Sequence, residues 1–392
     1  MAAARIRSIG TAVPPTVIEQ SAARDVFAAQ PGLGRLGERL VRTSFDQSGI
    51  QTRHTVLTEL EASAQPEGPA VFYDRSSRLL LDPGTGLRND LYAAVTSELV
   101  VEAARSALAE VPDLAASDIT HVVTVSCTGF FAPGPDFVLV KELGLRHDVA
   151  RQHIGFMGCQ GAFPGLRLAD AFCAADPDAV VLVVCVELCT LHVRSSSTTD
   201  QIVANSVFAD GAAAAVVTGR PGPAASPALR IDRLRSRLLP EGEQAMAWTI
   251  GDHGFEMVLS TYVPKLIDGS IGELVGGFAA DLDLASSRWA VHPGGRDILD
   301  RVQSRLGLDD EAMAPSRSVL RRFGNMSSAT VMFILADLLH AGGEVDRPVI
   351  AMAFGPGLSV ELGALTLEAA RTGAAVGAAA VEGAAVDGVP AA

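Results

Sequence analysis

The sequence predicts an α/β fold, in which β-strands buried on both faces alternate with amphipathic helices. Short runs rich in valine, isoleucine and leucine indicate such strands, because a strand inside a layered structure is covered on both sides. Runs with apolar residues at helical spacing lie between them. The chain of 392 residues is 48% hydrophobic and 19% charged, which is typical of a large packed core.

Five runs are expected as strands and four as helices. The expected strands are Ile119–Ser126, Ala179–Val186, Ala213–Thr218, Arg288–Val291 and Pro348–Ala353. The expected helices are Tyr92–Val111, Leu166–Ala174, Asp297–Leu306 and Ser327–His340. Pro112 follows the first helix and Gly342-Gly343 follows the last, in the positions where these residues end helices.

The chain is expected to divide within a Pro-rich segment, RPGPAASP, at residues 220–227. This segment separates a first half, residues 1–222, from a second half, residues 223–371. Residues 372–392 consist mainly of alanine, glycine and valine. Such a composition buries too little surface to order itself, so a disordered tail is expected there.

The charge and the apolar patterning exclude several classes of protein. A net charge of −14 excludes a basic whole-protein surface for nucleic acid or anionic lipid. No run is long and apolar enough for a signal peptide or a membrane span, so a cytoplasmic protein is expected. Five cysteines form an odd and sparse set, which does not indicate a disulfide framework.

Cys159 has the surroundings of a nucleophile. It lies in GFMGCQGAFPGL, between Gly158 and Gly161 and just before an expected helix. Unpaired N–H groups at a helix N-terminus stabilise a thiolate, and the glycines permit a tight turn and a close approach of substrate. The alternative is a small buried thiol that packs beside a turn.

Two polar residues of the second half lie on loops that lead into helices. His292, in WAVHPGGRDILD, follows an expected strand, and Asn325, in RFGNMSS, follows a glycine. Catalytic residues of α/β folds favour such loops. A structural histidine and a helix-capping asparagine are the alternatives.

Other motifs narrow the choice of chemistry. Cys185, Cys189 and His192 have the spacing C-x3-C-x2-H, but no second ligand pair completes a zinc site, so no metal is expected. The motifs of serine hydrolases, P-loop NTPases and dinucleotide-binding enzymes are missing. Glu187 interrupts an apolar run, which indicates a carboxylate that faces a cavity or is hydrogen-bonded.

Together these motifs resemble one family. Cys159 in MGC, His292 in HPGG and Asn325 in GNMSSA resemble the triad of type III polyketide synthases, the chalcone-synthase-like enzymes of the thiolase fold. The resemblance extends to IGTAVPP at residues 9–15, VFADGAAAAVV at 207–217 and FGPGLSVE at 354–361, and so covers almost the whole chain outside the tail. It implies a thiolase-like fold of two pseudo-duplicated α/β/α layered halves, with the active site between them.

The resemblance also implies a mechanism. The Cys159 thiolate, paired with the His292 imidazolium, takes the acyl group of an acyl-CoA starter as a thioester. His292 and Asn325 hydrogen-bond the thioester oxygen of malonyl-CoA and stabilise the enolate that decarboxylation leaves. The implied partners are CoA thioesters and a second copy of the chain, with an acyl carrier protein as an alternative starter donor. No cofactor is implied.

Residues around the substrate cavity follow from the same resemblance. Phe208 matches a gatekeeping phenylalanine where the CoA tunnel meets the cavity. The second gatekeeper position falls on Met257, with Phe255 as the alternative. The other cavity residues implied are Cys127, Cys189, His192, Ser327, Gly355, Pro356 and Gly357.

The CoA contacts match the family less well. Arg39, Arg42 and Arg53 lie in ERLVRTSFDQSGIQTRH, which resembles the CoA-contacting region of the family. A lysine of that region is replaced here by Gln47. Arginines on a solvated helix face are the alternative interpretation.

Cavity composition favours one group of products. Cys127, Cys189 and Met257 are small or flexible, and they indicate room for a fatty acyl starter that gives alkylpyrone or alkylresorcinol products, as in similar bacterial synthases. A malonyl-started, naphthalene-type synthase is the next alternative. Two further alternatives are a single-condensation enzyme similar to ketoacyl-ACP synthase III and a catalytically silent thiolase-fold subunit.

Overall fold

The computed structural model describes residues 3–61, 68–220, 226–341 and 346–368. Its strands are β1 (Arg5–Ala12), β2 (Thr16–Glu19), β3 (Thr52–Thr55), β4 (Tyr73–Asp74), β5 (Leu79–Leu80), β6 (His121–Ser126), β7 (Ala150–Gly155), β8 (Val180–Leu188), β9 (Asp210–Thr218), β10 (Ala228–Leu238), β11 (Met246–Gly251), β12 (Gly254–Leu259), β13 (Arg288–Val291), β14 (Arg347–Gly355) and β15 (Ser359–Glu368). Its α-helices are α1 (Gln20–Ala28), α2 (Gly34–Asp46), α3 (Thr85–Ala109), α4 (Pro135–Leu143), α5 (Ala162–Ala175), α6 (Thr199–Val207), α7 (Val263–Phe278), α8 (Arg296–Leu306), α9 (Asp310–Phe323) and α10 (Thr330–Ala341).

The predicted α/β class is confirmed, and the large sheet joins strands of both halves. Its strand order is β13-β14-β15-β10-β1-β9-β8-β6-β7. The five predicted strands correspond to β6, β8, β9, β13 and β14. The connection between the halves is the short antiparallel pairing of β1 with β10, at Arg5–Arg230 and Ile6–Leu229.

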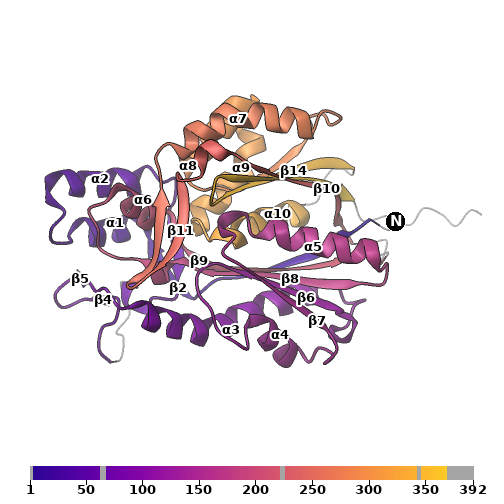
Figure 1. Ribbon diagram of the computed structural model, residues 1–392, viewed down its shortest axis with the longest axis horizontal. Coiled ribbons are helices and arrows are strands. Elements are labelled where there is room, and N and C mark those ends of the chain that lie inside the picture. Colours follow the sequence, from indigo (N-terminus) through magenta and orange to yellow (C-terminus); the bar gives the residue numbers. More distant parts are fainter. Residues whose placement is uncertain (1–2, 62–67, 221–225, 342–345, 369–392) are drawn as a thin grey trace, which may run out of the picture.

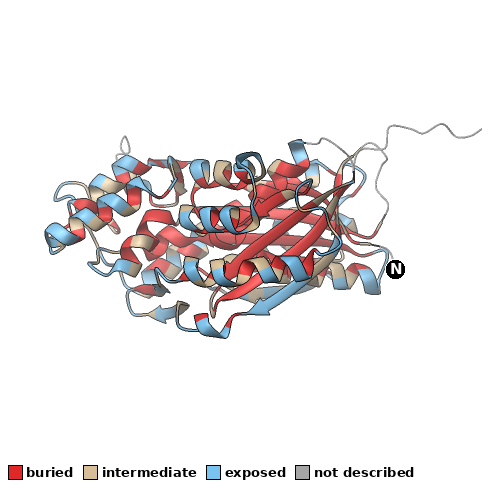
Figure 2. Ribbon diagram, turned by 90° about the horizontal axis from the view of Figure 1, so that it is seen from above, coloured by how far each residue is buried: buried red, intermediate tan, exposed pale blue. Residues whose placement is uncertain are grey.

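The elements form alternating layers (Figure 1). Helices α3 and α4 cover one side of the β9, β8, β6 and β7 region, and α5 and α10 lie on its other side. The β10 and β14 region lies beyond α5 and α10, and α7, α8 and α9 cover its outer face. Figure 2 shows that the strands in the middle are buried along most of their length.

Strand periodicity divides the apolar side chains among three cores. In β9, Ala213, Ala215 and Val217 face the middle core, which also holds residues of α5 and α10. The alternate residues of β9 face the core under α3. In β14, Val349 and Ala351 belong to the middle core, whereas Ile350 and Met352 belong to the core under α7 and α8. Each strand is therefore buried on both faces, as period-two side-chain alternation requires.

Some predictions fall outside the described residues. The expected tail at 372–392 lies there, and so does the expected boundary between residues 222 and 223. The division into two halves at that boundary stays a prediction. In the part of the chain that the structure describes, no helix has the length and apolar character needed to cross a membrane.

Candidate active site

Cys159 lies on a tight turn between β7 and α5. The turn contains a short 3-10 helix, Gly158–Gln160, directly before α5 begins at Ala162. Gly158 has a φ of 65°, and a Cβ atom there would lie 2.6 Å from Cδ of Pro356. Only glycine fits this position without displacing the Pro356 loop. The predicted placement of Cys159, just before a helix, is thus what the structure shows.

His292 follows β13 and is held by its backbone. The His292 N–H donates to Met352 O on the neighbouring strand β14, at 2.9 Å. The residue is 1% exposed. Neither ring nitrogen has a hydrogen-bond partner among the described residues. A buried polar group without a partner is costly, so the free imidazole nitrogens indicate a site kept for a substrate or a reacting atom.

Asn325 lies between α9 and α10, next to Cys159. Its Oδ1 accepts a hydrogen bond from the Ser327 N–H at 2.9 Å. Its Nδ2 lies 3.9 Å from Sγ of Cys159. Because Oδ1 is engaged by the backbone, the amide N–H groups are left to donate toward the sulfur or a bound substrate.

One cavity of about 250 Å³ brings these three residues together. Phe208 and Met257, the two predicted gatekeepers, line the same cavity. The lining ranges from the buried His292 and Phe354 and the half-buried Cys159 to the exposed Thr43 and Gln47. The remaining lining residues described are Ser44, Ser48, Val203, Ser206, Val207, Met246, Leu259, Ser260, Thr261, Val263, Pro264, Gly294, Gly295, Arg296, Asp297, Ile298 and Asn325.

Burial sets the resting protonation of the nucleophile and its neighbour. It raises the pKa of the Cys159 thiol to about 11, and it lowers the pKa of His292 to about 3. Both shifts favour the uncharged forms, since desolvation penalises charge. The expected thiolate–imidazolium pair is therefore disfavoured at rest. The neutral Cys159 thiol and the neutral His292 imidazole line the same cavity, and the imidazole can accept the thiol proton.

Cys127 and Ser327 belong to a buried polar network behind Cys159. Sγ of Cys127 lies 3.5 Å from Oγ of Ser327 and 3.4 Å from Oε2 of Glu187. Glu187 also accepts hydrogen bonds from the Cys127 N–H, from Thr128 and from Ser328. The expected hydrogen-bonded carboxylate at Glu187 is confirmed, and its burial raises its pKa.

The predicted cavity residue His192 is fully engaged in structural contacts. Its Nε2 donates to Thr128 O at 2.8 Å, and its Nδ1 accepts from the Phe255 N–H at 3.0 Å. The ring stacks on Phe255 with centroids 4.2 Å apart. Burial lowers the pKa of His192 to about 4, so the ring is neutral. Cys189, three residues earlier, is also buried, and this burial, together with the nearby Glu187, raises the pKa of its thiol.

Met257 and Phe255 differ in their surroundings. Met257 lines the cavity that holds Cys159. Phe255 is 3% exposed and packs against Phe130, Phe156 and Trp248 as well as His192. The arrangement favours Met257 as the second gatekeeper.

The Gly355-Pro356-Gly357 loop is not part of the cavity lining described above. It packs behind the turn that carries Cys159. A Cβ atom at Gly355 would lie 2.6 Å from Cγ of Gln160, and Pro356 contacts Gly158. The loop therefore supports the nucleophile turn, and its place in the cavity wall stays a prediction.

The expected CoA contacts are not brought to the cavity. Arg39 is exposed, and Arg42 forms exposed ion pairs with Asp25 and Glu38. Arg53 is 4% exposed and donates from Nη1 to the carbonyl oxygens of Asn205 and Phe208, at 2.8 and 2.7 Å. Sequence alone could not tell a buried guanidinium from a surface one.

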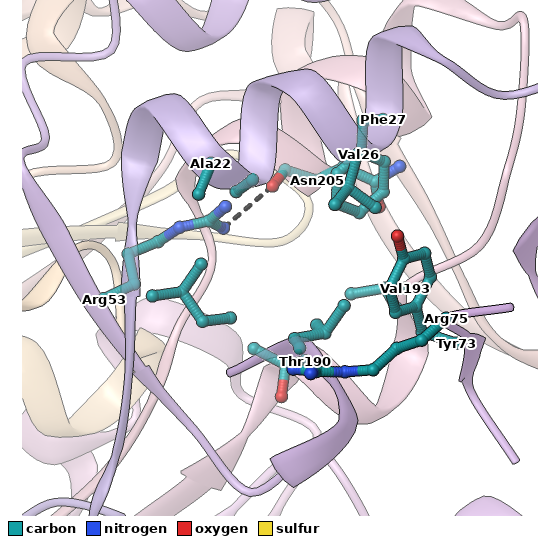
Figure 3. A pocket seen from close by; sticks show the side chains of 12 residues that line it. Ala22, Val26, Phe27, Arg53, Tyr73, Arg75, Thr190, Val193 and Asn205 are labelled. Carbon is teal, nitrogen blue, oxygen red and sulfur yellow. Dashed lines mark hydrogen bonds between the residues drawn. The ribbon is translucent and has the colours of Figure 1, made fainter. Parts of the chain in front are cut away.

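Arg53 lines a different cavity, of about 260 Å³, next to α1 (Figure 3). Figure 3 shows its guanidinium reaching the backbone oxygen of Asn205, with Ala22 and Val26 above and Thr190 below. Burial lowers the pKa of Arg53 to about 10. The hydrogen bonds to two carbonyl oxygens give Arg53 a structural role between β3 and α6.

Arg296 is a cavity residue that the sequence interpretation missed. It begins α8, three residues after Pro293 of the HPGG motif, and its guanidinium side chain is 40% exposed. Its place directly after HPGG is the signal that could have indicated it. In the described part of the chain, no group of three or more His, Cys, Asp or Glu residues is placed to hold a metal.

Two family models match most of the chain. Residues 1–221 match the N-terminal domain of chalcone and stilbene synthases, and residues 231–368 match the C-terminal domain. The chain belongs to the chalcone and stilbene synthase family. Synthases of this family, the type III polyketide synthases, condense malonyl-CoA units as acyltransferases and need no cofactor beyond their CoA thioester substrates.

Two relatives come from a plant and a social amoeba. The synthase is 34% identical to bisdemethoxycurcumin synthase of Oryza sativa subsp. japonica over 379 residues, covering 91% of each chain. It is 31% identical to probable polyketide synthase 1 of Dictyostelium discoideum over 366 residues, or 91% of this chain. The synthase spans only 11% of the length of that larger protein.

Two solved structures show the same fold. PKS-I of the brown alga Ectocarpus siliculosus superposes with a TM-score of 0.85 at 30% identity, over 93% of this chain and 98% of the other. The C-terminal type III polyketide synthase domain of Steely1, a type I/III hybrid from Dictyostelium, gives a TM-score of 0.84 at 30% identity, over 93% and 99%. The thiolase-like fold expected from the resemblance is confirmed. Enzymes of this family are typically homodimers, and a dimer of this synthase stays a prediction.

Proposed function

We propose that this synthase loads an acyl-CoA starter on Cys159, extends it with malonyl-CoA and cyclises the product. One observation carries the proposal: a thiol, an imidazole without hydrogen-bond partners and an amide donor line one cavity of about 250 Å³. They come from three segments distant in the sequence. Nucleophile, proton acceptor and oxyanion donor are the groups that acyl transfer requires.

Starter loading uses Cys159 and His292. Sγ attacks the thioester carbonyl of the starter while His292 accepts the thiol proton, and the C–S bond to CoA then breaks. The proton passes from His292 to the departing CoA thiolate, so the imidazole returns to its neutral form. A neutral histidine suits this task, because only the neutral ring can accept a proton.

Extension uses His292 and Asn325 together. The carboxylate of malonyl-CoA leaves as CO₂, and its bonding electron pair forms a thioester enolate. The imidazole N–H and the Asn325 Nδ2–H donate to the enolate oxygen. The enolate carbon attacks the acyl group on Cys159, and the C–S bond breaks so that Cys159 leaves as a thiolate. This thiolate can attack the lengthened acyl-CoA in another round.

The starter that fits this proposal best is a fatty acyl group, with alkylpyrone or alkylresorcinol products. Met257 is a flexible side chain on the cavity wall, opposite Trp248 in the β11–β12 hairpin. Cys127 and Cys189 are buried residues with small side chains. These residues support an extended aliphatic chain over a rigid aromatic starter.

Product analysis tests the proposal. Purified synthase receives malonyl-CoA with acyl-CoA starters of increasing chain length, and products are identified by mass spectrometry, with Cys159→Ala as the control. Tri- and tetraketide pyrones or resorcinols from long-chain starters are the expected result. Products from malonyl-CoA alone would support the naphthalene-type alternative. A single 3-oxo product that requires an acyl carrier protein would contradict the proposal.

A further inference from the structure

The open end of the active-site cavity lies between two segments of different halves. Thr43 in the last turn of α2 and Gln47 just after it form one side, and Gly294, Gly295 and Arg296 at the entry to α8 form the other. The loop after α2 approaches the start of α8, since a Cβ atom at Gly49 would lie 3.4 Å from Cβ of Arg296. A substrate that reaches Cys159 from this end must pass between them.

Positive charge is scarce along this route. Among the described residues that line the cavity, Arg296 is the only arginine or lysine. The synthase as a whole carries a net charge of −14. CoA carries a pyrophosphate and a 3′-phosphate, and negative charge of this density is bound best where a cation compensates it.

The guanidinium of Arg296 can still donate hydrogen bonds to a phosphate. Its Nε is buried and has no hydrogen-bond partner among the described residues. Arg296 forms an ion pair with Asp300 one turn later in α8, but the Nε–Oδ2 distance of 3.7 Å is beyond hydrogen-bond distance. The side chain is 40% exposed, so its head reaches solvent at the cavity entrance.

The backbone beside Arg296 adds to the positive electrostatic potential at this place. Gly295 is the N-cap of α8 and offers no side-chain cap. Gly294 and Gly295 carry no Cβ, so a ligand can approach the backbone closely here. The partial positive charge of the α8 N-terminus therefore reinforces the guanidinium rather than forming a site by itself.

We propose that Arg296 binds a phosphate of the CoA substrate, in place of the N-terminal arginines that the family resemblance implies. This inference rests on the proposed function. Arg39 and Arg42 do not line the cavity, and Arg53 is committed to the carbonyl oxygens of Asn205 and Phe208. Gln47, at the position where the family resemblance implies a lysine, lines the same cavity as Arg296.

Matched thioesters test the assignment. Arg296→Ala is assayed with malonyl-CoA and with malonyl N-acetylcysteamine thioester, which lacks the nucleotide and all phosphates. The KM for malonyl-CoA is expected to rise about 10- to 100-fold, as for the loss of a charged hydrogen bond. The KM for the truncated thioester and both kcat values are expected to stay within about twofold.

The matched control is Arg301→Ala. Arg301 lies on the same helix, pairs with Asp268 and does not line the cavity. Its KM for malonyl-CoA is expected to stay unchanged. An equal rise in KM for both thioesters in Arg296→Ala, or no rise for either, would overturn the assignment.

Direct binding separates this inference from the proposed reaction. Calorimetric titration with free CoA and with dephospho-CoA measures affinity without any turnover. A weaker affinity for CoA in Arg296→Ala supports the phosphate contact even if no polyketide forms. If that loss disappears with dephospho-CoA, the contact is to the 3′-phosphate, and if it persists, the contact is to the pyrophosphate. Unchanged affinity for both ligands would refute the contact.

Discussion

Asn325 and Phe208 form an isolated parallel bridge through their backbones. The Asn325 N–H donates to Val207 O, and the Ala209 N–H donates to Asn325 O, each at 2.9 Å. The proposed amide donor and the proposed gatekeeper come from different halves of the chain. Their relative position is thus set by main-chain hydrogen bonds and not by side-chain packing alone.

Arg53 stabilises the other side of this bridge. Replacing Arg53 with Gln leaves the buried carbonyl oxygens of Asn205 and Phe208 without their donor. We expect the free energy of unfolding, measured by urea denaturation, to fall by about 3 kcal/mol. The control, Arg42→Gln, removes only exposed ion pairs and is expected to cost less than about 1 kcal/mol. Equal losses in the two variants would contradict a structural role for Arg53.

His292 is expected to control the reactivity of Cys159. Because burial raises the pKa of this thiol to about 11, alkylation at pH 7 depends on a nearby proton acceptor. His292→Gln should slow modification of Cys159 by iodoacetamide about 100-fold. The rate is followed by peptide mass spectrometry, with Cys159→Ala as the control for labelling elsewhere. Identical rates in the wild type and His292→Gln would exclude His292 as the acceptor.

Asn325→Asp separates decarboxylation from starter loading. The aspartate keeps an oxygen to accept from the Ser327 N–H but loses the amide donor. We expect CO₂ release from malonyl-CoA to fall about 10²- to 10³-fold, as for loss of an oxyanion donor. Acylation of Cys159 by a starter, measured on the intact protein, should persist. Parallel loss of both activities would show that Asn325 acts on the nucleophile instead.

Gly158 and Gly307 form a matched pair of glycines with φ values of 65° and 64°. A Cβ at Gly307 meets nothing within 4 Å, whereas one at Gly158 meets Pro356. Gly307→Ala is expected to cost about 1–2 kcal/mol of stability and leave kcat unchanged. Gly158→Ala should also displace Cys159 and lower kcat about 100-fold. Equal kcat values for the two variants would contradict the role of the Gly158–Pro356 contact.

His192 makes stability depend on pH. Its pKa is about 4 in the folded protein and about 6.5 when unfolded, so the unfolded chain binds the extra proton between these values. Stability from His192 is therefore present above pH 6.5 and is lost as the pH falls toward 4, by about 3 kcal/mol. The His192→Gln variant lacks this titrating group. The difference in the free energy of unfolding between the wild type and this variant should therefore shrink by about 3 kcal/mol between pH 7 and pH 4. Urea denaturation at several pH values measures it, and a constant difference would refute the assignment.

Strands with a continuous apolar sequence could be predicted, whereas strands that contain several polar residues could not. Runs such as VVLVVCV in β8 have no polar residue to confuse their assignment. β7, with the sequence ARQHIG, alternates burial along its length and gives no such run. Likewise β10 carries arginines along most of its length, although it pairs with β15 inside the large sheet.

The motif residues Cys159, His292 and Asn325 were predictable because backbone turns require glycine and proline around them. The surroundings of the arginines were not. Whether a guanidinium meets a carbonyl oxygen, as Arg53 does, or a cavity, as Arg296 does, depends on contacts between segments about 150 or more residues apart in several cases. The engagement of both His192 nitrogens depends on the same kind of tertiary contact.

The middle layer of helices has a consequence for how the enzyme can be divided. Helices α5 and α10 bury side chains against strands of both halves, so each half alone would expose the inner side of its core to water. Cys159 precedes α5, and Asn325 precedes α10. Two fragments produced by cleavage within residues 221–225 would therefore be inactive apart. Turnover would return only when the two halves reassemble, so activity measures whether they have associated correctly.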